Sequence, residues 1–184
     1  HPLLRRLCLH GHGMMHLNGL ETLLLSDTSK ITELDIRTHH ASSPPMMGFT
    51  RVLQAFASRP TLIKLGLRRC RLGRDEARLL AMTLYHIQSL QSLVLTGGTL
   101  GSVGFAELAP ALYCNTSVKV LDISENDLID MESAEILRNI LRSNKTITTL
   151  DLLWNRFGQT TGAIECIAEG LGSNSTLLKI DLSK

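Results

Sequence analysis

The sequence is poor in the residues that give most globular cores their varied shapes and that supply common cofactor sites. Phe, Trp and Tyr make up only 4% of its 184 residues, and there is a single tryptophan. The four cysteines form no C-x-x-C pair, which argues against both a zinc ribbon and a disulfide framework. The sequence has no H-E-x-x-H motif, and its glycine-rich stretch 95–105 lacks the lysine of a P-loop. We therefore expect no catalytic centre, no cofactor and no bound metal.

Long apolar runs and a strong excess of one charge are also missing. No uncharged stretch reaches the roughly 18 apolar residues of a membrane span, so no membrane association is expected. The net charge is +2, but residues 1–92 hold 12 basic and 6 acidic side chains, whereas residues 93–184 hold 7 and 11. Nucleic-acid binding needs a continuous basic stripe, which this distribution does not supply. We expect no nucleic-acid partner and a molecule whose two ends carry opposite charge.

Leucine, by contrast, accounts for 35 residues and recurs in a fixed pattern. The pattern L-x-x-L-x-L, with Ile or Val allowed, starts near residues 4, 31, 62, 90, 118, 147 and 177. In each unit the last two apolar positions alternate with a polar or small residue, which indicates a short strand with one buried face. The spacing predicts one domain over 1–184, built from about six and a half repeats.

The second half of each unit has the spacing of a helix. Two columns of apolar residues precede the strands, and because they lie about one helical turn apart, both face the same way. The nearer column is Leu25, Phe56, Leu84, Leu112, Leu141 and Leu171, and the farther one is Val52, Leu80, Leu108, Leu137 and Ile167, with Glu21 as the exception. Parallel strands spaced about 4.8 Å apart, with wider helices outside them, must curve into an arc.

The segments "VKVLDISENDL", "ITTLDLLWNRF" and "TLIKLGLRRCRL" carry a resemblance to the leucine-rich repeat. The unit length resembles its ribonuclease-inhibitor-like subclass, and "SNKTITTLDLLWNRFG" resembles the repeats of NOD-like receptors. The resemblance implies an α/β solenoid, or horseshoe, with parallel strands on the concave face and helices on the convex face. Members of the family share geometry rather than one activity.

The resemblance also implies an asparagine column after the strands, which this sequence keeps only in part. The column reads His12, His39, Cys70, Gly98, Asn126 and Asn155. Histidine and cysteine there either bond to loop carbonyl groups or, as the alternative, bind a metal. The segment 41–49, with Pro44-Pro45 and two methionines, replaces the usual leucine. It either meets a partner as a bulged loop or fills a gap in the core.

Three Asn-x-Ser/Thr sequons begin at Asn115, Asn144 and Asn174, at the same phase of successive repeats. We expect these asparagines to end helices in the left-handed conformation, with glycosylation as the open alternative. Cysteines that show no sign of pairing fit a reducing compartment and a cytoplasmic location. The chain starts near the first motif and stops in the seventh strand without polar caps. We expect a piece of a longer array, or self-association through the uncapped ends.

The concave face is the expected binding surface. In such arcs the polar strand positions and the two residues after each strand point into the hollow. Arg37, Arg68 and Arg69 are expected to make its early end basic, whereas Asp122, Glu125 and Asp151 make its late end acidic. Leu153 and Trp154 lie outside the core columns, so they are either an exposed contact for a partner or ordinary packing against the next unit.

These features predict a non-catalytic protein-interaction scaffold or ligand-sensing module that binds a partner protein on its concave face. The alternative is a GTPase-activating regulator, because Ran GTPase-activating proteins belong to the family that the repeats resemble. Such a regulator would use a rim arginine near a phosphate, and the candidates are Arg69, Arg71 and Arg74.

Overall fold

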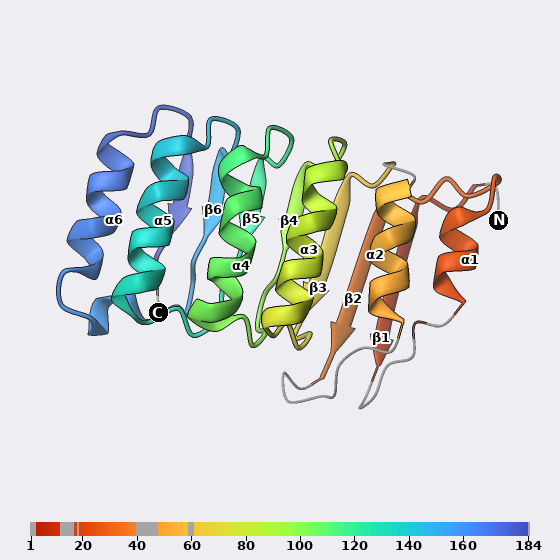
Figure 1. Cartoon of the computed structure of the whole chain (residues 1–184), viewed down its shortest axis with the longest axis horizontal. Coiled ribbons are helices and arrows are strands. Elements are labelled where there is room, and N and C mark those ends of the chain that lie inside the picture. The colour runs from red at the N-terminus through yellow and green to blue at the C-terminus, as the bar shows by residue number, and fades with distance from the viewer. Residues whose placement is uncertain (1–2, 12–16, 18, 40–47, 59–60, 184) are drawn as a thin grey trace.

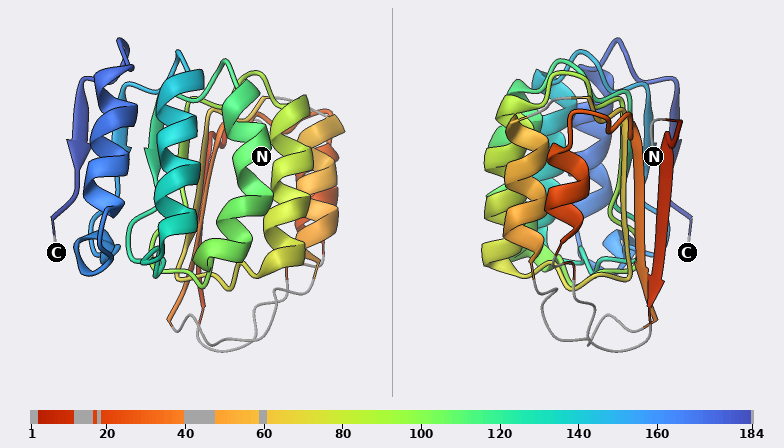
Figure 2. Two further views of the ribbon diagram at one scale, coloured as in Figure 1. Left: turned by 60° about the vertical axis from the view of Figure 1, so that its left-hand side comes forward. Right: turned by 90° about the vertical axis from the view of Figure 1, so that its right-hand side faces the viewer.

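The computed structural model describes residues 3–11, 17, 19–39, 48–58 and 61–183. Within this part strands and helices alternate along the chain and separate into two layers (Figures 1 and 2). The strands are β1 (Arg6–Gly11), β2 (Glu33–Thr38), β3 (Lys64–Arg68), β4 (Ser92–Val94), β5 (Val120–Asp122), β6 (Thr149–Asp151) and β7 (Lys179–Asp181). The helices are α1 (Leu20–Leu25), α2 (Phe49–Ser58), α3 (Arg74–His86), α4 (Gly101–Cys114), α5 (Met131–Ser143) and α6 (Ala163–Gly172), with a 3-10 turn η1 (Phe157–Gln159) before α6.

The strands of the described residues form one parallel sheet in sequence order, from β1 to β7. Parallel order follows because each helix returns the chain to the same end of the sheet. Backbone hydrogen bonds continue beyond the short strands: the Glu125 N–H donates to the Leu153 carbonyl group at 2.8 Å, and the Trp154 N–H donates to that of Ser183 at 2.9 Å. The residues after each strand are therefore held in register as firmly as the strands themselves.

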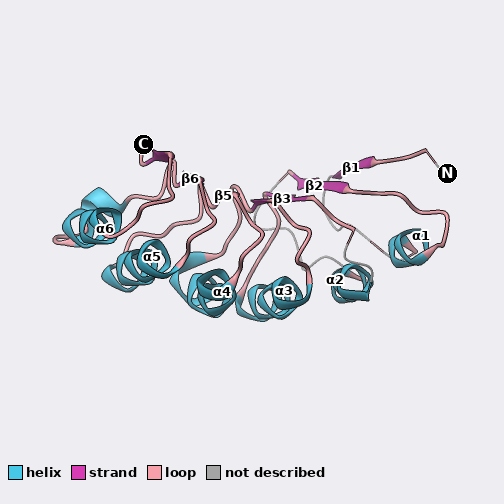
Figure 3. Cartoon of the chain, turned by 90° about the horizontal axis from the view of Figure 1, so that it is seen from above, coloured by secondary structure: helices cyan, strands magenta, loops and turns pink. Residues whose placement is uncertain are grey.

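The two layers bend into a shallow arc. Seen from above, the strands lie along the inner side and the helices along the outer side (Figure 3). Helices need more lateral room than strands spaced about 4.8 Å apart, so the helix layer takes the longer outer path. The predicted fold class is confirmed: the chain is an α/β solenoid with a concave sheet and a convex helix layer. The predicted loop 41–49 lies largely outside the described residues.

One leucine per strand fills the space between the layers. Leu34, Leu65, Leu93, Leu121 and Leu150 stand in register across β2 to β6, and none of them exposes more than 2% of its surface. Full burial of one such side chain stabilises the fold by about 1.5–3 kcal/mol. Each leucine packs between the layers of its own and the neighbouring units, so every repeat completes the core of the next.

The helices supply the other side of this core. Of the predicted columns, Val52, Leu80, Leu108, Leu137 and Ile167 are all buried.

The prediction for Leu25 was wrong. Its side chain is 44% exposed, whereas Leu24 is 7% exposed. Helix α1 has only six residues, and Leu20 and Leu24, one turn apart, face the core instead.

Side-chain amides tie each turn after a strand to the preceding repeat. The Nδ2 group of Asn126 donates to the carbonyl group of Leu95, and that of Asn155 donates to Ile123, both at 2.7 Å. In return, Asn155 Oδ1 accepts the N–H groups of Asn126 at 3.0 Å and Leu128 at 3.2 Å. Because these backbone groups are buried, an asparagine that leaves none of them unpaired stabilises the turn.

Cys70 occupies the position that Asn126 and Asn155 hold in their repeats, and its thiol is a weaker hydrogen-bond donor than their amides. Its thiol lies 3.6 Å from the carbonyl oxygen of Ile36 and 3.5 Å from that of Arg68. Burial raises the pKa of this thiol to about 12, so the sulfur stays protonated and able to donate. Among the described residues, no three His, Cys, Asp or Glu side chains gather as metal ligands, and His12 lies outside that part.

The prediction that the asparagines after the helices adopt a left-handed conformation was wrong. Asn115 and Asn144 are extended, with φ of −69° and −74°. Their side chains hold the turn instead. Asn144 Oδ1 accepts the N–H groups of Thr146 at 2.8 Å and Ile147 at 2.9 Å, and its Nδ2 donates to the carbonyl group of Leu112 at 2.8 Å. The hydroxyl of the residue two positions later also bonds to the asparagine Oδ1. The turn itself therefore accounts for the Asn-x-Ser/Thr pattern.

Candidate functional site

The inner surface of the sheet presents side chains in columns that run across the repeats. One column stands in strict register from β1 to β7, and it consists of Cys8, Asp35, Gly66, Val94, Asp122, Asp151 and Asp181. The middle of this column carries no charge, because β3 and β4 contribute Gly66 and Val94. Within this column the carboxylates therefore lie on either side of an uncharged pair, Gly66 and Val94.

At the early end, ion pairs reduce the basic character expected there. Arg68 Nε lies 3.4 Å from the carboxylate of Asp35, and Lys64 Nζ lies 3.3 Å from that of Glu33. Arg37 stands beside Arg68 in the register of β2 and β3, and it forms no ion pair within the described part of the chain. The positive charge left without an ion pair is thus smaller than a count of arginines suggests, and it resides on Arg37 and Arg69.

At the late end, the aspartates are partly occupied by the backbone. Asp122 Oδ1 accepts the Ser124 N–H, and Asp151 Oδ1 accepts the Leu153 N–H, both at 3.0 Å. The second oxygen of Asp122 accepts the hydroxyl of Thr96 at 2.8 Å. These two predicted site residues lie side by side across β5 and β6, and each holds the turn that ends its own strand.

The residues just before the Cys70, Gly98, Asn126 and Asn155 column share an unusual backbone conformation. Arg69, Gly97, Glu125 and Trp154 have φ of 54°, 70°, 55° and 59°, all in the left-handed region. For residues other than glycine this conformation costs about 1–2 kcal/mol each. We call these four residues the left-handed column.

Members of the left-handed column lie close together. A Cβ on Gly97 would come 3.0 Å from Cγ of Arg69 and 3.6 Å from Oε2 of Glu125. Glycine at this position therefore leaves room into which both neighbours extend. The structure brings Arg69 and Glu125 toward each other across Gly97.

Trp154 is the most exposed aromatic residue of the described chain, with 56% of its surface accessible. It lines an open hollow of about 290 Å³ together with Glu125 and Asp127. A second hollow, also about 290 Å³, lies between Trp154 and the apolar side chains of Phe157 and Leu182. Leu153 is half-buried. Of the two open interpretations, the exposure of Trp154 fits an available contact better than it fits internal packing.

Comparison with known proteins addresses what kind of repeat this is. The family model described as "Leucine Rich repeat" matches residues 114–135, which include Asn115, β5 and Asn126. The chain is a leucine-rich repeat protein. Its sequence is 38% identical over 88 residues, or 45% of the chain, to leucine-rich repeat-containing protein 45 of Gallus gallus. It is 35% identical over 94 residues, or 51% of the chain, to NACHT, LRR and PYD domains-containing protein 13 of Homo sapiens.

These matches cover only 13% and 9% of the length of the two relatives. They bear on the repeat architecture, which typically serves as a protein-interaction module. The second relative also agrees with the resemblance of this leucine-rich repeat chain to NOD-like receptor repeats.

The remaining sequence-based candidates contribute little to a site. Arg74 is one of three arginines considered for a GTPase-activating role. Its Nε donates a hydrogen bond to Glu107 Oε1 at 2.8 Å, and this bond raises the pKa of the guanidinium. Arg69 and Arg71 are exposed, but no feature of the described residues favours the GTPase-activating alternative. No described helix has both the length and the apolar character that crossing a bilayer requires.

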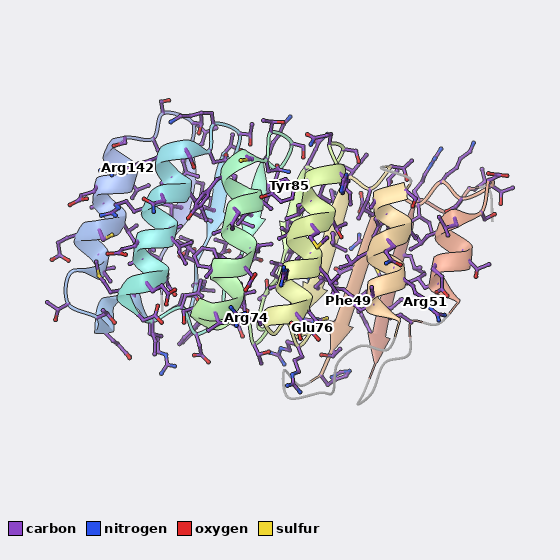
Figure 4. All side chains as sticks on the ribbon, viewed as in Figure 1. Phe49, Arg51, Arg74, Glu76, Tyr85 and Arg142 are labelled. Atoms are coloured by element: carbon purple, nitrogen blue, oxygen red, sulfur yellow. The ribbon has the colours of Figure 1, made fainter. Side chains whose placement is uncertain are left out.

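The convex face of this leucine-rich repeat protein carries exposed apolar groups that the sequence reasoning missed. Met82 and Tyr85 on α3 are 57% and 49% exposed, and Val103 on α4 is 54% exposed. Tyr85 and Arg74 can be followed on the helix side in Figure 4. For Val103 a signal was available, since helix α4 contains only one charged residue, Glu107, and so has no fully polar side to turn outward.

Proposed function

We propose that this leucine-rich repeat chain is a non-catalytic interaction module of the ribonuclease-inhibitor-like subclass, which binds a partner protein on its concave face. Its repeats act as one domain in this role, and the contact residues are Arg37, Arg68, Arg69, Asp122, Glu125, Asp151, Leu153 and Trp154. Among these, Arg37, Arg69, Glu125 and Trp154 make the leading contribution. The other four are engaged in ion pairs, turns or partial burial.

The observation that carries this proposal is the left-handed column. Arg69, Glu125 and Trp154 keep exposed side chains where glycine, as at Gly97, would avoid the conformational cost. Strained residues persist where the surrounding structure enforces them, and they cluster at binding sites. Four successive repeats contribute three large side chains and Gly97 to one row, which backbone hydrogen bonds hold in place as a pre-organised contact surface.

The charge of this surface defines the partner. Unpaired Arg37 and Arg69 lie toward β2 and β3, whereas Glu125 lies toward β5. A complementary protein presents acidic groups to the first end and basic groups to the second, which steers its approach and fixes its orientation. The near-neutral middle, with Gly66 and Val94, allows close approach of the two backbones.

We further propose a reducing, cytoplasmic setting. All four cysteines are free, and Cys8 and Cys114 are exposed without a partner for a disulfide. The sequon asparagines support the same setting, since Asn115 and Asn144 are 6% and 3% exposed and Nδ2 of Asn144 is bonded to two carbonyl groups. A glycan on Asn144 would break both bonds.

The test uses charge reversal on the two faces of the folded protein. Arg69→Glu and Glu125→Lys, each immobilised, should capture less of the proteins that the wild type retains from a cell lysate. Arg78→Glu and Glu135→Lys make the same charge changes at exposed positions on α3 and α5, and they should capture the same proteins as the wild type. Thermal unfolding confirms that each variant is folded. If the convex variants lose the bound proteins and the concave variants keep them, the proposed face is wrong.

A further inference from the structure

The hollow beside Trp154 combines an aromatic ring with acidic groups from the neighbouring repeat. Glu125, Asp127 and Trp154 line it, all three in the left-handed region and all three exposed. The Glu125 N–H bonds to the carbonyl group of Leu153, so the two repeats are fixed relative to each other at this point. The ring and the carboxylates therefore face one space whose walls are held by the backbone ladder.

The two carboxylates differ in what already neutralises them. Asp127 Oδ1 accepts a short, charge-assisted hydrogen bond from Nη2 of Arg156 at 2.7 Å. Glu125 forms no ion pair and its side chain accepts no hydrogen bond from any described residue. The hollow thus carries one carboxylate without an ion pair, next to the exposed Trp154.

This chemistry selects the occupant by sign. An anion would be repelled by the Glu125 carboxylate. An apolar group would remove water from the carboxylates without offering them a hydrogen bond in its place. A cation gains from both walls, because the face of tryptophan attracts positive charge and the carboxylate accepts a charge-assisted hydrogen bond. A planar guanidinium can stack on the ring and bond to the carboxylate together, which an ammonium group does less well.

We propose that this hollow receives an arginine side chain of the partner protein, stacked on Trp154 and hydrogen-bonded to Glu125. The inference rests on the proposed concave-face binding and names the group that anchors the basic part of the partner. Because the hollow lies at the acidic end of the sheet, an arginine seated there also orients the partner's acidic part toward Arg37 and Arg69.

The single tryptophan allows a direct test in the folded protein. The indole N–H signal of Trp154 is followed by two-dimensional NMR while N-acetylarginine amide is added, and the uncharged isostere N-acetylcitrulline amide serves as the ligand control. We expect the signal to shift saturably with the arginine derivative and not with the citrulline derivative. Glu125→Gln should weaken binding about 5-fold or more, and Glu135→Gln, the same change on α5, should leave it at the wild-type value.

The outcomes separate this inference from the proposed function. Equal shifts with both ligands, or equal weakening by Glu125→Gln and Glu135→Gln, overturn the arginine site. If the arginine derivative fails to bind while Arg69→Glu and Glu125→Lys still abolish partner capture, the arginine site is wrong and concave-face binding stands. Saturable binding that needs Glu125 supports the site whether or not a lysate contains the partner.

Discussion

The side-chain oxygen of Asn126 lies 3.0 Å from the point that a Cβ on Gly98 would occupy. The asparagine reaches back over the preceding repeat, where it bonds to the backbone of Leu95 and receives a longer bond of 3.4 Å from the Leu100 N–H. Gly98 looks in the sequence like a lost asparagine. In the structure it is the space that the next asparagine fills.

Replacing Gly98 with alanine should therefore destabilise the protein by about 1–3 kcal/mol, as overpacking of a tight site does. The added methyl group would meet the backbone carbonyl oxygen of Cys70 at 2.9 Å as well as the Asn126 amide, and neither can move without breaking the turn. Urea unfolding measures the effect. Gly158→Ala is the control, since a Cβ there meets nothing within 4 Å, and equal losses for both variants would contradict the packing argument.

The left-handed column gives a prediction of opposite sign. Glu125→Gly should raise the free energy of unfolding by about 0.5–1 kcal/mol, because glycine adopts φ of 55° without steric cost. The same substitution at Glu135, in the interior of α5, should lower it by about 1 kcal/mol through the loss of helix propensity. Thermal unfolding of the two variants checks the pair. A loss of stability in both would show that the Glu125 side chain supports the fold.

Helix α5 should respond to acid through Asp130. Burial raises the pKa of this carboxyl group, but hydrogen bonds from Ser133, including its N–H at 2.9 Å, outweigh burial and lower the pKa below the ordinary value. A lowered folded-state pKa stabilises the protein above the unfolded-state value of about 3.9, and this contribution disappears as the pH falls through the folded-state pKa. Asp130→Ala should therefore cost about 1 kcal/mol near neutral pH and progressively less below about pH 4.

Urea unfolding of Asp130→Ala at several pH values measures this trend. Asp130→Asn retains the accepting oxygen without the charge, so its smaller cost should not vary with pH. A penalty for Asp130→Ala that is the same in acid and at neutral pH would contradict the assigned role of the carboxylate.

The thiols should divide into two classes. Cys8 and Cys114 are exposed and should react rapidly with a thiol reagent, whereas Cys70 and Cys166 are buried and should react only as the protein unfolds. Cys70 adds a second barrier, because its pKa of about 12 leaves almost no thiolate near neutral pH. The time course of reagent release reports both classes. Substituting Cys8 and Cys114 with serine should remove the rapid phase entirely, and a rapid phase that persists would place a third thiol at the surface.

The regular parts of the fold could be predicted because one packing arrangement recurs. Leu65, Leu93 and Leu121 occupy the same buried position on successive strands, so their spacing in the sequence is enough to identify the column. Leu25 was misplaced because a helix of six residues is too short for the apolar phase to identify its inner face. The conformation of Asn144 was missed because its side-chain bonds to the backbone replace a left-handed cap.

The candidate surface could be predicted as a set of positions but not as a set of free groups. Register placed Arg37 beside Arg68, yet only the structure shows that Asp35 pairs with Arg68 and leaves Arg37 unpaired. The left-handed column had one visible sign, Gly97, since glycine is the usual residue for positive φ. Arg69, Glu125 and Trp154 conceal that conformation, because their residue types do not favour it.

The row formed by Arg69, Gly97, Glu125 and Trp154 also bears on how such a surface changes during evolution. At each position the backbone N–H bonds to the next unit whatever the side chain is, so a substitution leaves these hydrogen bonds in place. One substitution per repeat can then change the side chains that a partner contacts while the core leucines stay the same. A family of copies that differ mainly in this row would share one scaffold and recognise different proteins.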